Sequence, residues 1–238
     1  MTTPASAPPA APPPVWGVPP RRQSFLLGLD LGQARDWTAL VIAERHDTEP
    51  AGYDLRHIER WRGERYPRLV ETVRARVDAL RAMPGPSGLW PELRLVIDAT
   101  GVGRPVLDMF LEAELGIAVT GVTITGGQTV TRTDDGYAVP KRLLASTLQV
   151  LLQSGRLRFT AGSPLTRTLA DELQNFRVKI SLGGHDSYGA GDDWRDGNHD
   201  DLVLAASLAC WFGERNEGSW EEIAEHTDLG RFFRDIGL

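Results

Sequence analysis

The stretch Leu93-Arg94-Leu95-Val96-Ile97-Asp98-Ala99-Thr100-Gly101-Val102-Gly103 decides the fold class. Its first six residues form a short, largely apolar run of the kind found in strands that are buried on both faces of a sheet. The glycines then turn the chain into a helix predicted over Arg104–Leu115, and another strand is predicted over Ala118–Ile124. A strand, a helix and a strand in this order form a crossover between parallel strands, so the sequence predicts an α/β fold.

The segments on either side of this crossover extend the pattern. Upstream, β-type runs over Phe25–Leu31, Thr38–Glu44 and Tyr53–Arg62 predict an antiparallel meander, and a helix begins at Pro67. Downstream we expect a loop or hairpin over Thr125–Asp135, a helix over Pro140–Leu152 and a short strand over Arg156–Thr160. A helix over Leu165–Phe176, a second hairpin over Arg177–Tyr188 and a long apolar helix over Asp200–Phe212 follow. The pattern alone predicts an α/β fold. An antiparallel meander, a crossover and then a helix that carries acids is the order of the ribonuclease H-like fold, a mixed sheet of antiparallel meander and parallel crossover strands flanked by helices, and this topology rests on the positions of the acids described below.

The two ends of the chain differ from its middle. Residues 1–20 contain eight of the sixteen prolines and no charged residue, which is typical of a linker or a disordered tail. We therefore expect a Pro-rich tail over 1–23, one domain over 24–216 and a helical appendage over 217–238. A domain of this size can bury a substantial core.

Composition excludes several classes of protein. The sequence contains no run approaching the roughly 18 apolar residues of a membrane span and no visible secretory signal. Cys210 is the only cysteine, so disulfides within the chain and cysteine-based zinc sites are excluded. The net charge of −6 hides an uneven distribution, because Thr131–Lys179 carries a net charge of +4 and Ile180–Leu238 a net charge of −9. A local basic face can bind phosphates although the whole chain is acidic.

Two aspartates each lie at the end of a predicted strand. Asp30 lies in Gly28-Leu29-Asp30-Leu31-Gly32, and Asp98 ends the apolar run quoted above. Asp30 alone is also compatible with a hairpin turn, and Asp98 alone with a cap of the next helix. However, a buried carboxylate is costly unless it is paired or bound to a metal ion, and sites in α/β proteins collect at the carboxyl ends of parallel strands.

A third acidic segment, His199-Asp200-Asp201, precedes the long apolar helix. Capping of that helix explains one of the two aspartates but not the second. His199 is interpreted either as a polar loop residue or as a group next to the metal ligands. Together the three segments supply oxygen ligands of the kind that Mg²⁺ or Mn²⁺ prefers, and two such ions can promote the hydrolysis of a phosphodiester.

With these residues in view, the chain resembles the nuclease domain of phage large terminase subunits, over about Phe25–Glu214. The resemblance is carried by four segments in the same order: GLDLG…DWTALVI (28–42), VIDATGVGRPVLD (96–108), VPKRLLASTLQVLLQSGRLRF (139–159) and NHDDLVLAASLA (198–209). It implies a two-metal endonuclease that cuts double-stranded DNA with little sequence specificity. It also implies that the chain acts in the host cell cytoplasm, with an ATPase motor, a portal and a small terminase subunit as partners.

The resemblance also assigns residues to roles. Asp30, Asp98, Asp200 and Asp201 correspond to the metal-binding acids, and Asp30, Asp98 and Asp201 to the catalytic set. Asp201 is favoured over Asp200 because an aspartate directly precedes the equivalent helix in the related Holliday-junction resolvases. Arg104, Lys141 and Arg142 flank the crossover and the following helix and are the candidate phosphate contacts.

One part of the family pattern is missing, because the sequence contains no G-x-x-x-x-G-K-[ST] motif of an ATPase motor. We expect either a separated nuclease domain or a fragment that is encoded alone. Three alternatives stay open: a Holliday-junction resolvase-like nuclease, a non-catalytic DNA-binding module and an actin/sugar-kinase-type ATP-binding domain. The last fits least well, because that superfamily duplicates the domain and gives no role to His199-Asp200-Asp201.

Overall fold

A computed structural model describes residues 23–32, 36–83, 85, 88–101, 103–159, 164–175 and 200–215. The tail predicted over 1–23, apart from Gln23, lies outside the described residues. The same holds for the hairpin predicted over 177–188, for His199 and for the appendage predicted over 217–238.

Within these residues, strands form one mixed sheet in the order β6-β7-β5-β4-β1-β2-β3-β8. The strands are β1 (Ser24–Asp30), β2 (Trp37–His46), β3 (Gly52–Arg62), β4 (Glu92–Asp98), β5 (Ala118–Thr125), β6 (Thr131–Thr133), β7 (Gly136–Pro140) and β8 (Leu157–Phe159). The pairs β1–β2 and β2–β3 are antiparallel, whereas β1–β4, β4–β5 and β5–β7 are parallel. Both the predicted meander and the predicted crossover are therefore confirmed.

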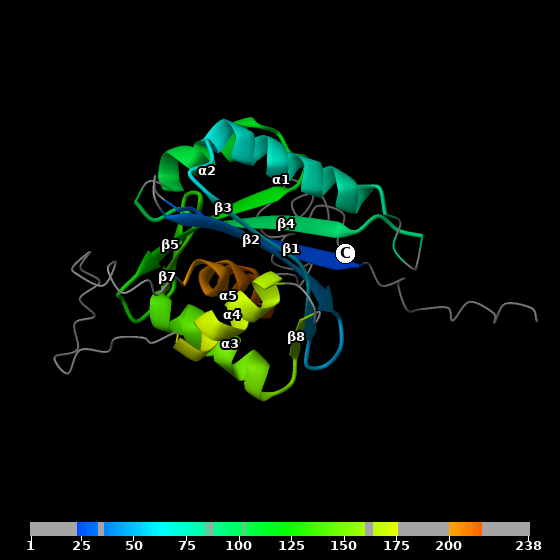
Figure 1. Ribbon diagram of the computed structural model, residues 1–238, viewed down its shortest axis with the longest axis vertical. Coiled ribbons are helices and arrows are strands. Elements are labelled where there is room, and N and C mark those ends of the chain that lie inside the picture. The colour runs from blue at the N-terminus through cyan, green and yellow to red at the C-terminus, as the bar shows by residue number, and fades with distance from the viewer. Residues whose placement is uncertain are drawn as a thin grey trace, which may run out of the picture.

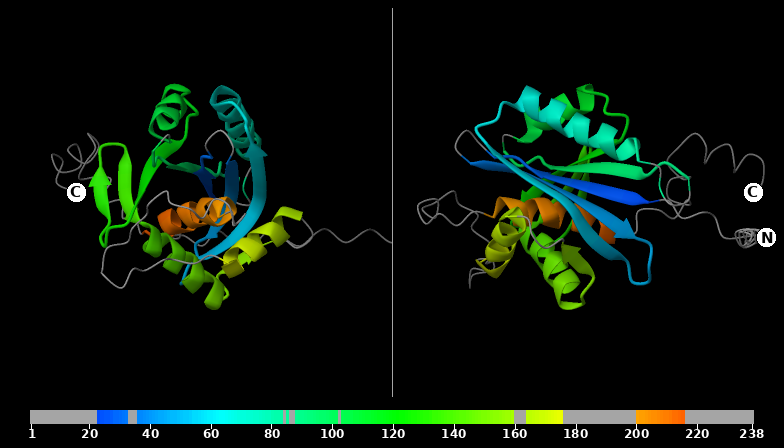
Figure 2. Two further views of the ribbon diagram at one scale, coloured as in Figure 1. Left: turned by 60° about the vertical axis from the view of Figure 1, so that its left-hand side comes forward. Right: turned by 45° about the vertical axis from the view of Figure 1, so that its right-hand side comes forward.

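Helices cover both faces of the sheet (Figures 1 and 2). They are α1 (Tyr66–Arg81), α2 (Gly103–Glu112), α3 (Lys141–Gln153), α4 (Pro164–Asn175) and α5 (Asp201–Glu214). The first two lie on one face, and α3, α4 and α5 lie on the other. Among the described helices, none has the length and apolarity that crossing a membrane requires.

The side chains of β1 alternate between two cores. Leu27 and Leu29 pack with α1 and α2, while Leu26 belongs to the core around α5. Helix α5 is apolar all round because it lies between the sheet on one side and α3 and α4 on the other, so that the thirteen residues Asp201–Gly213 are buried.

Gly28 allows α5 to approach β1 closely. A Cβ atom at this position would lie 1.9 Å from the carbonyl oxygen of Ala205 in α5. No side chain fits in that space, so a glycine is required where the helix crosses the strand. The close crossing brings the start of α5 to the end of β1, where Asp30 lies.

The segment Thr125–Asp135, predicted as a loop or a hairpin, contains β6 and the turn to β7. The strand β7 itself was not predicted, because Gly136 and Pro140 interrupt any strand pattern in so short a run. It pairs in parallel with β5 and extends the sheet beyond the crossover. Pro140, predicted to open the helix, ends β7 and precedes Lys141, the first residue of α3.

Candidate metal centre

Asp30 and Asp98 lie side by side at the carboxyl ends of the adjacent parallel strands β1 and β4. The contact between their carboxyl groups acts to raise the pKa of Asp30 and to lower that of Asp98. Asp30 is buried. Burial raises the pKa of Asp30 well above its usual range, and the negative charges of Asp98, Asp200 and Asp201 raise it further. All three acidic segments therefore meet at one site.

The turn that follows β4 holds Asp98 in place. Its Oδ1 atom accepts a hydrogen bond of 2.8 Å from the backbone N–H of Thr100, whose Oγ1 atom accepts one of 2.8 Å from the N–H of Ile124. Burial raises the pKa of Asp98, although the hydrogen bonds from Thr100 and Asp30 and the charge of Lys141 act in the opposite direction. Asp98 thus shapes the turn before α2 and still faces Asp30.

Asp200 precedes α5, but its side chain makes no hydrogen bond that caps the helix. Instead, its Oδ2 atom lies 2.7 Å from Nζ of Lys141, the first residue of α3. Lys141, predicted as a phosphate contact, is therefore placed by the structure beside the acidic residues.

Asp201 is the first residue of α5 and is buried. Both of its carboxylate oxygens face Arg60 of β3. The Nη2 atom of Arg60 donates a hydrogen bond of 2.7 Å to Oδ1, and Nε lies 2.6 Å from Oδ2. The aspartate that the resemblance favours as the third ligand is thus held by a guanidinium group.

Glu172 of α4 completes this buried group. Its Oε2 atom accepts hydrogen bonds from the N–H groups of Leu202 (3.0 Å) and Val203 (3.2 Å), and so caps α5, while Oε1 lies 3.3 Å from Nη2 of Arg60. Burial and the charge of Asp201 raise the pKa of Glu172 to about 7, against the opposing charge of Arg60 and the two backbone hydrogen bonds.

Neither Arg60 nor Glu172 was predicted from the sequence, although each lies in a recognisable pattern. Arg60 lies on the same face of β3 as Ile58, which packs against the core around α5. Glu172 lies three residues after Leu169 and seven after Leu165, on the apolar stripe of α4. A charged residue at a core position of each element indicates a buried ion pair.

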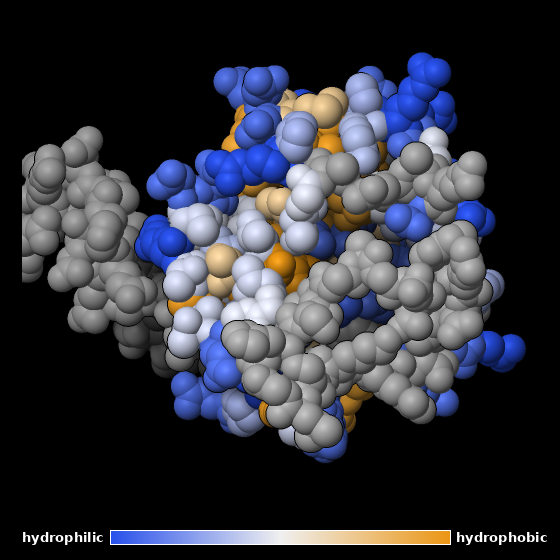
Figure 3. All heavy atoms as spheres, turned by 90° about the vertical axis from the view of Figure 1, so that its left-hand side faces the viewer, coloured by the Kyte–Doolittle hydropathy of each residue, from blue (hydrophilic) through white to orange (hydrophobic). Residues whose placement is uncertain are grey.

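The other two predicted phosphate contacts lie near the β6–β7 hairpin. The Nη2 atom of Arg104 pairs with Oδ2 of Asp135, and Nη2 of Arg142 donates a hydrogen bond of 3.1 Å to the carbonyl oxygen of Gln128. The side chain of Arg104 is 56% exposed, so it can also reach an external anion. Figure 3 shows the side of the molecule on which β1 ends, where the described atoms are mostly hydrophilic and apolar atoms form small patches between them.

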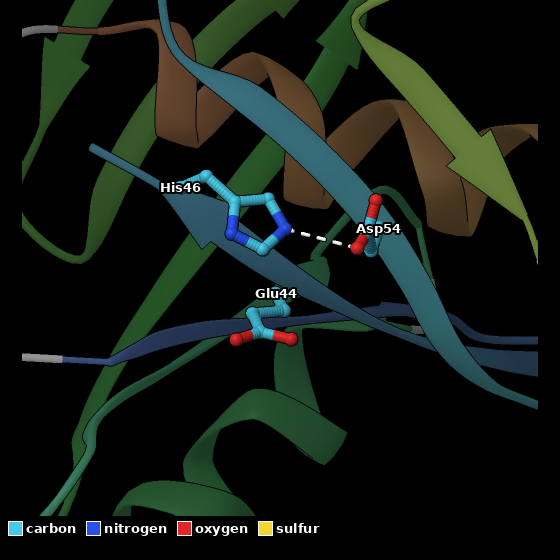
Figure 4. Close-up of side chains that lie close together, drawn as sticks. All are labelled: Glu44, His46 and Asp54. Atoms are coloured by element: carbon cyan, nitrogen blue, oxygen red, sulfur yellow. Dashed lines mark ion pairs between the residues drawn. The ribbon is translucent and has the colours of Figure 1, made fainter. Parts of the chain in front are cut away.

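A second group of possible ligands lies at the opposite end of the sheet, at the β2–β3 hairpin (Figure 4). Within the described part of the chain, Glu44, His46 and Asp54 are the residues whose ligand atoms all lie within 4.8 Å of one another. The acids at the end of β1 form no group as tight as this, because Asp200 turns to Lys141 and Asp201 to Arg60.

Charge distinguishes the two ends of the sheet. At the hairpin, Nη2 of Arg56 lies 2.6 Å from Oε2 of Glu44, and Nε of Arg158 donates a hydrogen bond of 2.7 Å to Oδ1 of Asp54. Burial acts to raise the pKa of Asp54, but the hydrogen bonds from Arg158 and His46 hold this pKa below its usual value. The carboxylates of Glu44 and Asp54 in this hairpin group are thus paired with arginines. At the end of β1, the described residues place Lys141 beside Asp200 and Arg60 beside Asp201.

Comparisons with known proteins concern the family and the fold. The sequence model of the family described as the terminase RNaseH-like domain matches residues 27–211. The comparison with curated proteins gave no match.

Among solved structures, the nuclease domain of the large terminase subunit of bacterial virus Sf6, a point variant with manganese and β-thujaplicinol, has a TM-score of 0.54 at 15% identity, over 79% of this chain and 88% of that chain. The human cytomegalovirus terminase nuclease domain, manganese-soaked and inhibitor-bound, has a TM-score of 0.51 at 13% identity, over 81% and 83% of the two chains. These similarities confirm the ribonuclease H-like fold that the sequence predicts.

Proposed function

Because the chain belongs to the family of terminase RNaseH-like domains, we propose that it is a metal-dependent endonuclease that cuts double-stranded DNA with little sequence specificity, as in the packaging of phage genomes. The observation that carries the proposal is the convergence of Asp30, Asp98, Asp200 and Asp201 from three distant segments. Burial and the negative charges of the other three raise the pKa of Asp30, and a bound cation relieves such repulsion.

The donor set suits a hard divalent ion, because all four candidate ligands are carboxylates. We assign Mg²⁺ or Mn²⁺ to the site, in agreement with the manganese in the structures of the Sf6 and cytomegalovirus domains. Asp30 and Asp98 are the central ligands, with Asp200 or Asp201 as the third. Bound there, two such ions supply the positive charge that activates a water molecule and stabilises the leaving oxygen of a phosphodiester.

The protein's own residues hold the ligands and guide the DNA. The bond from Thr100 orients the Asp98 carboxylate, and Lys141 places a positive charge next to Asp200. Lys141, Arg142 and Arg104 remain the candidate phosphate contacts in this proposal. The chain as a whole is acidic, so binding to DNA is expected to be weak and sensitive to salt.

The proposed role in packaging also names partners. An ATPase motor, a portal and a small terminase subunit are the proteins with which such a nuclease works on phage DNA, in the host cell cytoplasm.

The test is cleavage of supercoiled plasmid by the full chain with Mn²⁺, and with EDTA as the metal-free control. Wild type and Asp54→Asn are expected to cut, and Asp98→Asn is expected not to cut. Asp54→Asn is the matched control, because it removes a carboxylate from the hairpin group at the other end of the sheet. Equal cleavage by wild type and Asp98→Asn would refute the assignment, and a preference for four-way junctions over linear duplex would indicate a resolvase instead.

A further inference from the structure

The two adjacent acids at the start of α5 have different surroundings. The side chain of Asp201 is 9% exposed and lies on Arg60, whereas that of Asp200 is 42% exposed and lies on Lys141. Asp200 precedes the helix with a non-helical backbone conformation and Asp201 is the first helical residue, so the two carboxylates face different partners. The structure therefore gives these two adjacent aspartates different environments.

Arg60 is itself held on several sides. Its side chain is 10% exposed, its guanidinium group lies 4.5 Å from the ring centroid of Trp37 on β2, and it contacts both Asp201 and Glu172. A buried guanidinium that stacks on an aromatic ring and meets two carboxylates has little freedom to move. Lysine cannot reproduce this arrangement, because it lacks the planar fork.

Glu172 fixes the same end of α5 through the backbone. The first N–H groups of a helix have no partner inside the helix, and Glu172 accepts two of them, from Leu202 and Val203. The backbone next to Asp200 is thus held by the contact of the Asp201 side chain with Arg60 and by the bonds from the N–H groups of Leu202 and Val203 to Glu172. Asp200 takes no part in this anchoring through its own side chain.

We propose that Arg60 and Glu172 are positioning residues that hold Asp201 as an anchor in the protein and thereby present Asp200, rather than Asp201, to the metal ions. This inference rests on the proposed function. Arg60 and Glu172 touch neither the metal ions nor the DNA. They act by fixing the start of α5 relative to Asp30 and Asp98.

The test is titration calorimetry of the full chain with Mn²⁺ in the absence of DNA, paired with the Mn²⁺ concentration that gives half-maximal plasmid cleavage. Asp200→Asn is expected to abolish measurable Mn²⁺ binding, and Asp201→Asn to retain it within about tenfold, which is the scale of effects beyond the direct ligands. Arg60→Met is expected to weaken Mn²⁺ binding by about tenfold or more. When Arg60→Met is combined with Asp201→Asn, it is expected to cause little further loss of Mn²⁺ affinity, because the two side chains act as one unit.

Controls separate positioning from folding. Arg56→Lys changes an arginine of the same strand that pairs with Glu44 at the far end of the sheet, and it is expected to leave Mn²⁺ binding unchanged. Thermal unfolding shows whether each variant folds. If Arg60→Met does not fold, Arg60→Lys and Glu172→Gln replace it, and both are expected to raise the Mn²⁺ concentration for half-maximal cleavage while the rate at saturating Mn²⁺ changes less.

The outcomes distinguish this inference from the proposed function. If wild type neither binds Mn²⁺ nor cuts DNA, the proposed function fails and the positioning role falls with it. If wild type does both but Asp201→Asn loses Mn²⁺ binding as completely as Asp200→Asn, only the positioning role is overturned. Unchanged Mn²⁺ binding in folded Arg60 and Glu172 variants overturns it as well.

Discussion

Nζ of Lys141 lies 2.7 Å from Oδ2 of Asp200, so the first residue of α3 and the residue before α5 form an ion pair beside the buried acids Asp30 and Asp98. A side chain thus brings a positive charge to the place where the proposal puts metal ions. The pair links two helices on the same face of the sheet. Both side chains remain partly exposed, so the contact can open without disrupting the core.

Replacement of Lys141 by Met is expected to separate metal binding from DNA binding. The pair with Asp200 is partly exposed, so its loss should lower the free energy of unfolding by less than about 1 kcal/mol. Mn²⁺ affinity should stay the same or increase, because the competing ammonium group is gone, while duplex DNA should bind more weakly. Calorimetry with Mn²⁺ on the single variant measures the first effect. Fluorescence anisotropy with duplex DNA, with Asp98→Asn added to prevent cleavage, measures the second. Loss of Mn²⁺ binding would show that Lys141 helps to build the site.

Salt dependence tests the phosphate contacts. Each contact that is removed should reduce the slope of log affinity against log salt concentration by about 0.9. Arg142→Ala and Arg104→Ala are each expected to show this reduction for duplex DNA, again in the Asp98→Asn background. Arg158→Ala is the control, because Arg158 pairs with Asp54 at the far end of the sheet. If the slope of log affinity against log salt concentration is the same in all three variants, then residues other than Arg104 and Arg142 contact the phosphates.

The raised pKa of Glu172 predicts how stability depends on pH. Between the ordinary value of 4.5 and the folded value of about 7, the folded protein binds a proton at Glu172 that the unfolded chain has lost. The free energy of unfolding contributed by this group therefore falls as pH rises, by about 3 kcal/mol across the interval. Urea unfolding with EDTA between these pH values should show a shallower pH dependence in Glu172→Gln than in wild type. An identical dependence in both proteins would contradict the assignment.

Gly28→Ala tests whether the close approach of α5 positions the acids. The added Cβ atom would lie 1.9 Å from the carbonyl oxygen of Ala205, so α5 must move away from β1. Overpacking of this kind costs about 1–3 kcal/mol or more, and the shift should also weaken Mn²⁺ binding. Gly52→Ala is the matched control, because the nearest atom to its new Cβ would lie 3.6 Å away. Equal unfolding free energies for the two variants would exclude this role for Gly28.

The sequence predicts the fold and the acids for a simple physical reason. Asp30 and Asp98 each end an apolar run, and the carboxyl ends of parallel strands meet at one edge of a sheet. Asp200 and Asp201 begin an apolar helix, and such a helix must be buried against the sheet. These are local patterns, so they can be read without knowing any contact between distant residues.

The partners of the acids could not be predicted in the same way. The position of Arg60 beside Asp201 depends on the register of three strands and on the placement of α5 over the sheet, and no local pattern records either. Lys141 was predicted as a phosphate contact because it begins a helix after the crossover, but its ion pair with Asp200 depends on how α3 and α5 pack together. The choice between Asp200 and Asp201 likewise depends on Arg60 and Glu172, and these come from other elements.

Because α5 is buried on all sides, the site can be completed only late in the synthesis of the described part of the chain. The helix is the last described element in the chain, yet it fills the centre of one core and follows directly on an acid of the site. A ribosome-bound chain that has not yet released this segment lacks both the helix that completes the core and the third acid. Under the proposed function, the growing chain therefore cannot cut DNA until α5 has been synthesised and has packed against the sheet.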